Sequence, residues 1–345
     1  MKKLLQIMAA LGLVVVTGLV GANVSAQSTG VGVNPRIDHT IRTGETATGR
    51  LLVSNLNRSQ PLTVNVRIVD FSAYDETGTP KLMTADNAAQ TAWSLKPYLN
   101  LPETIEVAAG EQKYIDYSIK IPDNVGAGSY YSAIQYAAVG GDGGQVALNA
   151  APTTLAFVTV PGRATELLTL DKFGGYQANE NSQGGFKSFF TTRAPQQLAY
   201  RLTNSGTVAE NPKGSIIIKN IFGKEVATIK NANPKDNLAL IGQTRRFDVC
   251  IKSKTTEAQT DNGQQVATEE CENPKLAPGI YTATMALYYG INGSNTQEIN
   301  AKTTFWYMPV WFIIVLVVIV ALIALGIYFL RKKLIAGRVK SRKRK

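Results

Sequence analysis

The chain has 345 residues and a formal net charge of +11, from 36 Lys and Arg against 25 Asp and Glu. Nine of the basic residues lie in 331–345, and Lys2 and Lys3 are the only charged residues before residue 27. Residues 27–330 are therefore formally neutral, with 25 basic and 25 acidic side chains. A nucleic-acid-binding protein is expected to carry a basic patch in its folded part, so this distribution argues against that class.

The first 26 residues have the pattern of a secretory signal peptide. Two lysines precede a mostly apolar run from Leu4 to Val20, and Val24-Ser25-Ala26 places small residues at a cleavage site before Gln27. An uncleaved run would instead act as a second membrane anchor. Either form sends the following segment across a membrane.

Residues 27–162 are predicted to form a first β-sandwich. Short runs rich in Val, Ile, Thr and Tyr alternate with turn residues every eight to twelve positions, which is typical of antiparallel sheets. The expected strands are Ala47–Ser54, Leu62–Val69, Thr104–Val107, Lys113–Ile121, Ser129–Val139 and Thr153–Val160.

Residues 163–304 are predicted to form a second, membrane-proximal β-sandwich. A Gly- and Asn-rich stretch from Gly174 to Gly185 is expected to be an exposed loop. The expected strands are Ala164–Phe173, Phe186–Arg193, Gln197–Thr203, Gly214–Asn220, Gly223–Ile229, Thr244–Ile251, Gly279–Tyr289 and Gln297–Phe305. The predicted fold class is all-β, with two immunoglobulin-like sandwiches followed by a single transmembrane helix.

The two cysteines, Cys250 and Cys271, both lie in the part expected to be exported. An oxidising compartment favours a disulfide between them. The loop between them, Lys252 to Glu270, is polar and is expected to hold little shape by burial. A zinc site is the rival interpretation, but no CxxC occurs and the one histidine, His39, is far away in sequence.

The segment from Pro309 to Leu330 contains no charged residue. About 20 apolar residues in a helix cross a bilayer core of about 30 Å, so residues 305–330 are predicted to hold a transmembrane helix. Trp306, Tyr307 and Trp311 suit the membrane interface on the upstream side. Arg331, Lys332 and Lys333 begin the basic tail 331–345 and act as a stop-transfer signal, which places the C-terminus in the cytoplasm.

The sequence indicates neither a catalytic centre nor a cofactor. His39 stands beside Asp38 in a polar stretch and is interpreted as a surface histidine, and no G-x-S-x-G motif occurs. Acidic residues after Asp261 lack the order of a calcium-binding EF-hand loop. Paired carboxylates of a glycan hydrolase stay open as an alternative, since they need only a suitable separation in space.

Several stretches resemble the WxL-interacting proteins of bacterial surfaces. In the first half these are Leu101 to Pro122 (LPETIEVAAGEQKYIDYSIKIP) and the run from Gly128 to Ile134 (GSYYSAI). In the second half they are Leu202 to Gly206, Pro212 to Ile216 and Phe222 to Val226. The resemblance implies immunoglobulin-like modules, peptidoglycan binding by the first, binding of surface proteins or host ligands by the second, and no catalysis.

We therefore expect a single-pass bacterial cell-membrane protein with an extracellular ectodomain. Its predicted function is binding or scaffolding, with peptidoglycan or other surface proteins as partners. Two alternatives stay open: an envelope enzyme that hydrolyses glycans or peptides, and a structural component of a secretion or adhesion complex.

Overall fold

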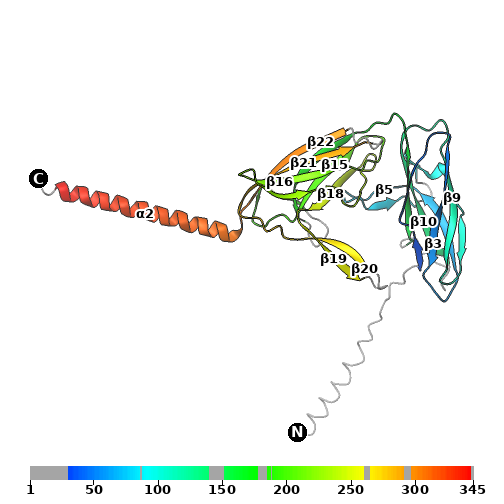
Figure 1. Cartoon of the computed structure of the whole chain (residues 1–345), viewed down its shortest axis with the longest axis horizontal. Coiled ribbons are helices and arrows are strands. Elements are labelled where there is room, and N and C mark those ends of the chain that lie inside the picture. The colour runs from blue at the N-terminus through cyan, green and yellow to red at the C-terminus, as the bar shows by residue number, and fades with distance from the viewer. Residues whose placement is uncertain are drawn as a thin grey trace, which may run out of the picture.

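The computed structural model shows two β-rich bodies in series and a long helix that leaves the second one (Figure 1). The predicted signal peptide lies outside the described residues. The structure describes residues 30–85, 88–139, 151–177, 185–187, 189–259, 265–290 and 297–342.

The first sandwich is built from strands that lie between Val31 and Val160. Its four-stranded sheet has the order β1-β3-β9-β7, with β1 (Val31–Val33), β3 (Thr46–Asn55), β9 (Gln112–Lys120) and β7 (Leu99–Asn100). Its five-stranded sheet has the order β2-β11-β10-β4-β8, with β2 (Arg36–Thr40), β11 (Thr153–Val160), β10 (Gly128–Val139), β4 (Leu62–Val69) and β8 (Thr104–Val107).

The second sandwich repeats this plan between Leu168 and Tyr307. Its four-stranded sheet has the order β13-β12-β15-β18, with β13 (Gly185–Phe186), β12 (Leu168–Gln177), β15 (Gln197–Asn204) and β18 (Thr244–Cys250). Its five-stranded sheet has the order β14-β22-β21-β16-β17, with β14 (Phe190–Thr191), β22 (Gln297–Tyr307), β21 (Gly279–Tyr289), β16 (Lys213–Asn220) and β17 (Glu225–Ile229).

Two hairpins and two helical elements complete the fold. The hairpins are β5 (Phe71–Ala73) with β6 (Pro80–Leu82), and β19 (Ser253–Gln259) with β20 (Gln265–Cys271). A short 3₁₀ helix, η1, spans Lys96–Tyr98, and the long helix α2 spans Val310–Arg342. The all-β fold class with one C-terminal apolar helix is thus confirmed.

Alternation of buried and exposed residues explains the long strands. In β11 every second side chain, from Thr154 to Val160, is buried between the two sheets of the first sandwich. In β21 Tyr281, Ala283, Met285 and Leu287 face the core of the second sandwich in the same way. A two-residue period buries one face of each strand, so apolar burial fixes both the sheets and their register.

Two edge pairs are parallel, whereas every other strand pair is antiparallel among the described residues. Strand β2 runs parallel to β11, with His39 opposite Val158, and β14 runs parallel to β22, with Phe190 opposite Trp306. Both pairs join segments that are far apart in the sequence. Such pairs are not closed by a hairpin, and a parallel orientation is therefore available to them.

The structure corrects several local predictions. The Gly-rich stretch predicted as a loop from Gly174 begins inside β12, which continues to Gln177. The expected strand Phe186–Arg193 is two short strands, β13 and β14. The loop between the cysteines, for which no strand was predicted, is largely the hairpin β19–β20, whose partners run from Ser253 opposite Cys271 to Gln259 opposite Gln265.

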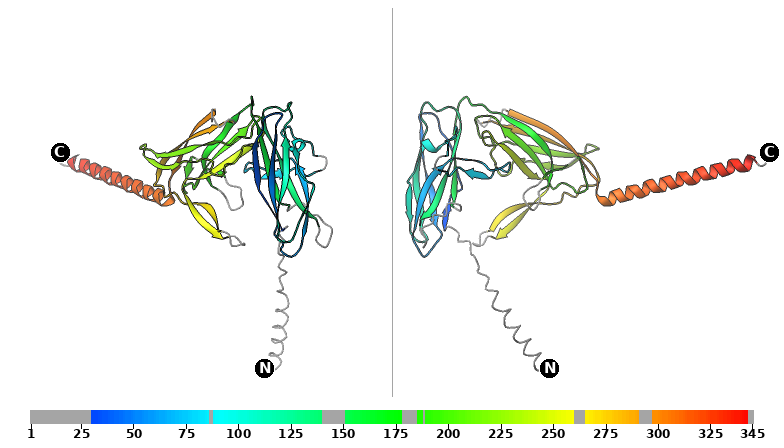
Figure 2. Two further views of the ribbon diagram at one scale, coloured as in Figure 1. Left: turned by 45° about the vertical axis from the view of Figure 1, so that its right-hand side comes forward. Right: turned by 180° about the vertical axis from the view of Figure 1, so that it is seen from behind.

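One contact between the two sandwiches is the β5–β6 hairpin, which extends from the first body towards the second (Figures 1 and 2). Another is Ser129 on β10, whose N–H donates to the carbonyl of Thr207 at 3.0 Å. A separate apolar cluster fills this junction. Its buried members are Val69, Phe71, Tyr131, Ala133 and Leu240, and only Leu240 comes from the second sandwich. The junction is therefore a small packed core and not only a linker.

Candidate functional site

The single histidine is partly buried and has a hydrogen-bond partner in the opposite sheet. His39 is half-buried on β2, and its Nε2 lies 2.7 Å from the hydroxyl of Tyr117 on β9. This hydrogen bond joins the edge strand β2 of one sheet of the first sandwich to the inner strand β9 of the other sheet. Among the described residues, no group of three or more His, Cys, Asp or Glu could hold a metal ion.

Tyr117 reaches His39 because its cross-strand partner is a glycine. Gly49 on β3 stands directly opposite Tyr117, and a Cβ at this position would lie 2.4 Å from the tyrosine hydroxyl oxygen. The ring occupies the space of the missing side chain. Burial in this place raises the pKa of the Tyr117 phenol, because ionisation would put a charge in an apolar environment.

An open groove of about 830 Å³ lies on the first sandwich, beside this pair. Strand β7 ends at Asn100, and Pro102 cannot donate a ladder hydrogen bond, so the chain leaves β9 at this point. The groove lies along β3 and β9, next to the point where the chain after Asn100 separates from β9. It is lined by Thr48, Gly49, Arg50, Asn100, Leu101, Pro102, Asp116, Tyr117 and Ser118.

The groove presents both hydrogen-bond donors and hydrogen-bond acceptors. Arg50 and Asp116 stand opposite each other on β3 and β9, and Thr48 stands opposite Ser118 in the same way. The guanidinium of Arg50 lies 5.2 Å from the centroid of the exposed Tyr114 ring, beyond the lining residues. A guanidinium, a carboxylate and hydroxyls next to an exposed aromatic ring suit a polar ligand with apolar faces, such as a sugar polymer.

A second set of charged residues fixes the junction between the sandwiches. Glu76, at the tip of the β5–β6 hairpin, accepts hydrogen bonds from Arg201 at 3.3 Å and from Arg246 at 2.5 Å. The backbone N–H of Arg246 also donates to the carbonyl of Glu76 at 2.6 Å. Arg201 and Arg246 are cross-strand neighbours on β15 and β18. The Glu76 carboxylate therefore binds both guanidinium groups and offsets the repulsion between their positive charges.

Arg246 is the most buried member of this set, with 8 % of its side chain exposed. Burial lowers its pKa, but the hydrogen bonds and charges of Asp248 and Glu76 outweigh burial and raise it overall. Its guanidinium also lies 4.5 Å from the ring centroid of Tyr176. A buried cation held by two carboxylates is costly to leave half-paired, so the hairpin position is strongly specified.

A buried carboxylate organises the first sandwich next to the junction. Asp70 accepts hydrogen bonds from the hydroxyls of Ser94 at 2.7 Å and Ser132 at 2.9 Å, and from the backbone N–H of Thr91 at 3.0 Å. It thereby attaches the segment before η1 to β10. Both carboxylate oxygens of Asp70 accept hydrogen bonds from the protein itself, so the network has a structural role.

A smaller hollow of about 200 Å³ opens between the two bodies. Its lining includes three basic residues, Arg36, Lys235 and Arg245, and one acidic residue, Asp236. Arg36 is already paired with Asp38 at 2.6 Å. The pKa of Arg245 is lowered by burial and by the charge of Arg36.

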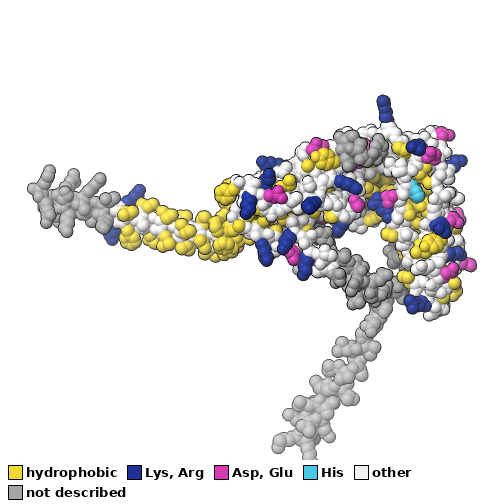
Figure 3. Space-filling view, in the orientation of Figure 1, with side chains coloured by type: hydrophobic (Ala, Val, Ile, Leu, Met, Phe, Trp, Pro, Cys, Tyr) yellow, Lys and Arg dark blue, Asp and Glu magenta, His cyan; other side chains and the backbone are white. Residues whose placement is uncertain are grey.

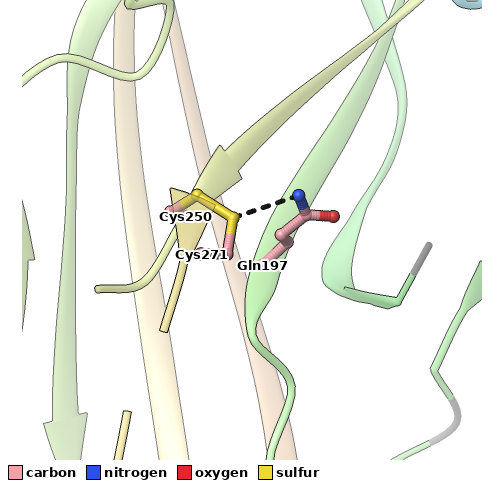
Figure 4. Close-up of a disulfide and its surroundings, with 3 residues drawn as sticks. All are labelled: Gln197, Cys250 and Cys271. Carbon is pink, nitrogen blue, oxygen red and sulfur yellow. Dashed lines mark hydrogen bonds between the residues drawn. A yellow bond between two sulfur atoms is a disulfide. The ribbon is translucent and has the colours of Figure 1, made fainter. Parts of the chain in front are cut away.

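The predicted disulfide between Cys250 and Cys271 is present. Cys250 ends β18 and Cys271 ends β20, with Cα atoms 5.1 Å apart. Gln197 on β15 donates from its Nε2 to the sulfur of Cys271 at 3.2 Å (Figure 4). The bridge thus attaches the β19–β20 hairpin to the sheet that carries β15 and β18.

Helix α2 is long and apolar enough to cross a membrane between Val310 and Lys332. It continues to Arg342, so it includes most of the predicted tail. A single helix needs no core of its own, and Lys and Arg are good helix formers. Arg331 and Lys332 are exposed on this helix, and Lys333 lies within its bounds.

The predicted interface aromatics lie on both sides of the point where sandwich and helix meet. Trp306 and Tyr307 end β22, and Trp311 is exposed in the first turn of α2. Tyr307 is half-buried against the core of the second sandwich. The link between β22 and α2 is short, since Val310 already belongs to the helix.

Neither the groove nor the Glu76 contacts are indicated by the sequence. The groove depends on where the chain after Asn100 leaves β9, and Glu76 meets Arg246 across 170 positions of sequence. The polar stretch around Glu76 had only a turn signal, Asp75 to Gly78. Its carboxylate had no pattern that could connect it with the distant arginines.

No protein-family model and no curated protein matches the chain, so the resemblance to WxL-interacting proteins stays a prediction. Among solved structures, the class 5 fimbriae chaperone CfaA is 12% identical over 81% of this chain and 100% of that chain, with a TM-score of 0.32. A chain of the Salmonella enterica SafA pilin and SafB chaperone complex is 9% identical over 80% and 95%, with a TM-score of 0.33. A PapD-like domain of human CEP192 is 14% identical over 43% and 96%, with a TM-score of 0.26.

Proposed function

We propose that this chain is a membrane-anchored binding protein of a bacterial cell surface, which holds peptidoglycan in the groove of its first sandwich. The observation that carries the proposal is the pairing of a polar groove on the first sandwich with a membrane-length helix after the second. The groove lies on one body and the anchor leaves the other. The protein would hold its ligand near the membrane without catalysing a reaction.

The chemistry of the groove supports a glycan polymer as the ligand. Arg50, Asp116 and Asn100 supply donors and acceptors for hydroxyl, amide and carboxylate groups. Tyr114 supplies an exposed ring beside them. The resemblance of the first sandwich to a peptidoglycan-binding module leads to the same proposal from sequence.

The proposed orientation places both sandwiches outside the cell and the basic segment that starts at Arg331 in the cytoplasm. Nine basic residues after the apolar segment, without an acid, supply the charge asymmetry that keeps this end inside. Surface proteins are further candidate partners of the second sandwich.

A hydrolase with paired carboxylates is less well supported. Among the described residues that line the groove, Asp116 is the single carboxylate. Acid–base cleavage of a glycosidic bond needs two carboxyl groups on opposite sides of the bond. The groove therefore suits binding better than hydrolysis.

The test is sedimentation of the full chain, in detergent micelles, with purified peptidoglycan. We expect the wild type to sediment with it. The double variant Arg50→Ala with Asp116→Ala should bind about tenfold more weakly, a loss of roughly 1.4 kcal/mol of binding free energy. The matched control is Arg42→Ala with Glu45→Ala, which removes an exposed ion pair of the same sandwich outside the groove.

Wild-type protein that stays in the supernatant would rule out peptidoglycan as the ligand. Equal loss of binding in the groove variant and the control would place the binding surface elsewhere.

A further inference from the structure

Exposed apolar side chains gather at the end of the second sandwich from which α2 leaves. Phe222 is 90% exposed and Ile221 is 66% exposed, at the turn between β16 and β17. Phe189, Phe190 and Trp306 are exposed at the opposite edge of the same sheet, where β14 pairs with β22. We call these five residues the apolar collar. Figure 3 shows hydrophobic side chains at this end of the body, beside the start of the helix.

Strand register places the collar at one end of one sheet. Asn220, which precedes the turn, pairs with Tyr281, and Tyr281 pairs with Phe305 near the end of β22. On the other side of β22, Phe190 pairs with Trp306. The collar residues therefore lie at the same end of the sheet: in the turn after β16, at β14 and at the end of β22.

The turn that carries Ile221 and Phe222 is ordered. The side-chain oxygen of Asn220 accepts hydrogen bonds from the backbone N–H groups of Phe222 and Lys224, both at 3.0 Å. Gly223 has a φ of 76°, the left-handed conformation that glycine adopts without strain. A rigid turn thus holds two large apolar side chains in solvent, where polar turn residues are usual.

The aromatic edge is equally well fixed. The N–H of Trp306 donates to the carbonyl of Phe189 at 2.6 Å. The Trp306 ring centroid lies 6.4 Å from that of Phe189 and 5.8 Å from that of Phe190. Three rings from two distant segments form one exposed aromatic group.

The connection between the second sandwich and the helix is short and fixed to the sandwich. Met308 is buried in the body, and its N–H donates to the carbonyl of Thr191 at 2.9 Å. Pro309 then accepts from the first turn of α2, and the apolar span starts at Val310. A bilayer that receives α2 must begin at the level of the collar.

We infer that the apolar collar is a bilayer-docking surface, which inserts its side chains into the headgroup region around the anchor. Large aromatic rings are favoured at this depth, and an exposed apolar patch of this kind marks a contact surface. Lys219 and Lys224 are exposed on either side of the turn and suit anionic lipid headgroups. The inference rests on the membrane anchoring in the proposed function.

The test uses the full chain in vesicles made of equal parts phosphatidylglycerol and phosphatidylcholine. Phe222→Cys is labelled with an environment-sensitive fluorophore, since the native cysteines are paired with each other. A fraction of the lipids carries a spin-label quencher in the acyl chain. The matched control is Tyr114→Cys, an exposed aromatic position on the first sandwich.

We expect the probe at position 222 to be quenched severalfold more strongly than the probe at 114. The double variant Lys219→Glu with Lys224→Glu should reduce quenching at 222 in these vesicles. The control double variant Lys96→Glu with Lys120→Glu, on exposed lysines of the first sandwich, should leave it unchanged.

Flotation of the same vesicles separates the two possible failures. A chain that does not float with the lipid refutes the anchor, and the docking surface with it. A chain that floats but shows equal quenching at 222 and 114 leaves the anchor in place and overturns the docking surface alone.

Discussion

At the scale of single residues, absent side chains matter as much as present ones. Gly49 makes room for the Tyr117 ring, which reaches His39 from the opposite sheet. His39 therefore has a structural partner 78 positions away in sequence. The sequence shows its neighbour Asp38 and a polar stretch, but it does not indicate the distant Tyr117 hydroxyl as a partner.

Glu210 is a buried acid whose ionisation opposes folding. Burial and the nearby charge of Glu166 raise its pKa to about 7, despite a hydrogen bond from the backbone N–H of Gly290. The folded state therefore binds a proton that the unfolded chain releases at about pH 4.5. Stability is predicted to fall as pH rises from about 4.5 to about 7, and this contribution is constant above that range.

The variant Glu210→Gln should remove this dependence. At pH 8 it is expected to be more stable than the wild type by on the order of 2–3 kcal/mol, with little difference at pH 4. Denaturant unfolding of the full chain in detergent at both pH values measures the effect. Exposed Glu103→Gln is the control, and a Glu210→Gln variant that keeps the wild-type pH slope would refute the explanation.

At the scale of elements, alternation predicted the long strands well. Strands such as Leu62–Val69, Thr104–Val107 and Gly279–Tyr289 were predicted with the bounds that the structure shows. Their burial follows a two-residue period, which the sequence displays directly.

Short elements without a clear two-residue alternation of apolar side chains are not predicted from the sequence. Strand β2 is short and polar, and it is fixed by parallel pairing with β11. The β5–β6 hairpin is fixed by the second sandwich. The groove likewise depends on tertiary structure, because it forms where one strand separates from another, and no local motif indicates such a place.

We expect the β19–β20 hairpin to depend on the disulfide between Cys250 and Cys271. Its sequence is polar, and an isolated two-stranded hairpin is marginally stable in water. Replacing both Cys250 and Cys271 by Ser should reduce stability by about 3 kcal/mol on the chain-entropy model. It should also remove the protection of β19 and β20 against amide hydrogen exchange while β15 stays protected.

Denaturant unfolding and hydrogen exchange of the full chain check this prediction. Unchanged exchange in β19 and β20 after the double substitution would show that the hairpin is stable without the bridge.

At the scale of the whole molecule, the angle between the two sandwiches is set by few contacts. Glu76 contributes the charged part, and the small apolar cluster around Phe71 contributes the apolar part. Ser129 adds two hydrogen bonds, from its backbone N–H to the carbonyl of Thr207 and from the N–H of Ala209 to its hydroxyl. Replacing Glu76 by Ala leaves Arg201 and Arg246 opposite each other without the shared carboxylate. We expect a loss of about 1–3 kcal/mol and a wider range of angles between the sandwiches.

Pulsed electron-spin distance measurements would show this change. Spin labels at Tyr114→Cys and Lys230→Cys report on the first and second sandwich, and both positions are exposed. The distance distribution should be narrow in the parent and broader in the Glu76→Ala variant. Glu45→Ala, which removes an exposed pair with Arg42 in the first sandwich, should leave it narrow. A narrow distribution in the Glu76 variant would show that the other contacts between the sandwiches fix the angle without this carboxylate.

The buried Met308 has a mechanical consequence. Strand β22 continues into the helix almost without a linker and pairs with β21 along its whole length, from Gly279 opposite Tyr307 to Tyr289 opposite Gln297. When tension from a ligand on the first sandwich acts against the anchor, it loads all of these hydrogen bonds in shear at once. A strand in this position resists extraction far better than one that can be peeled from its end. If the proposed anchor holds, we expect force on the second sandwich to reach the helix through this strand.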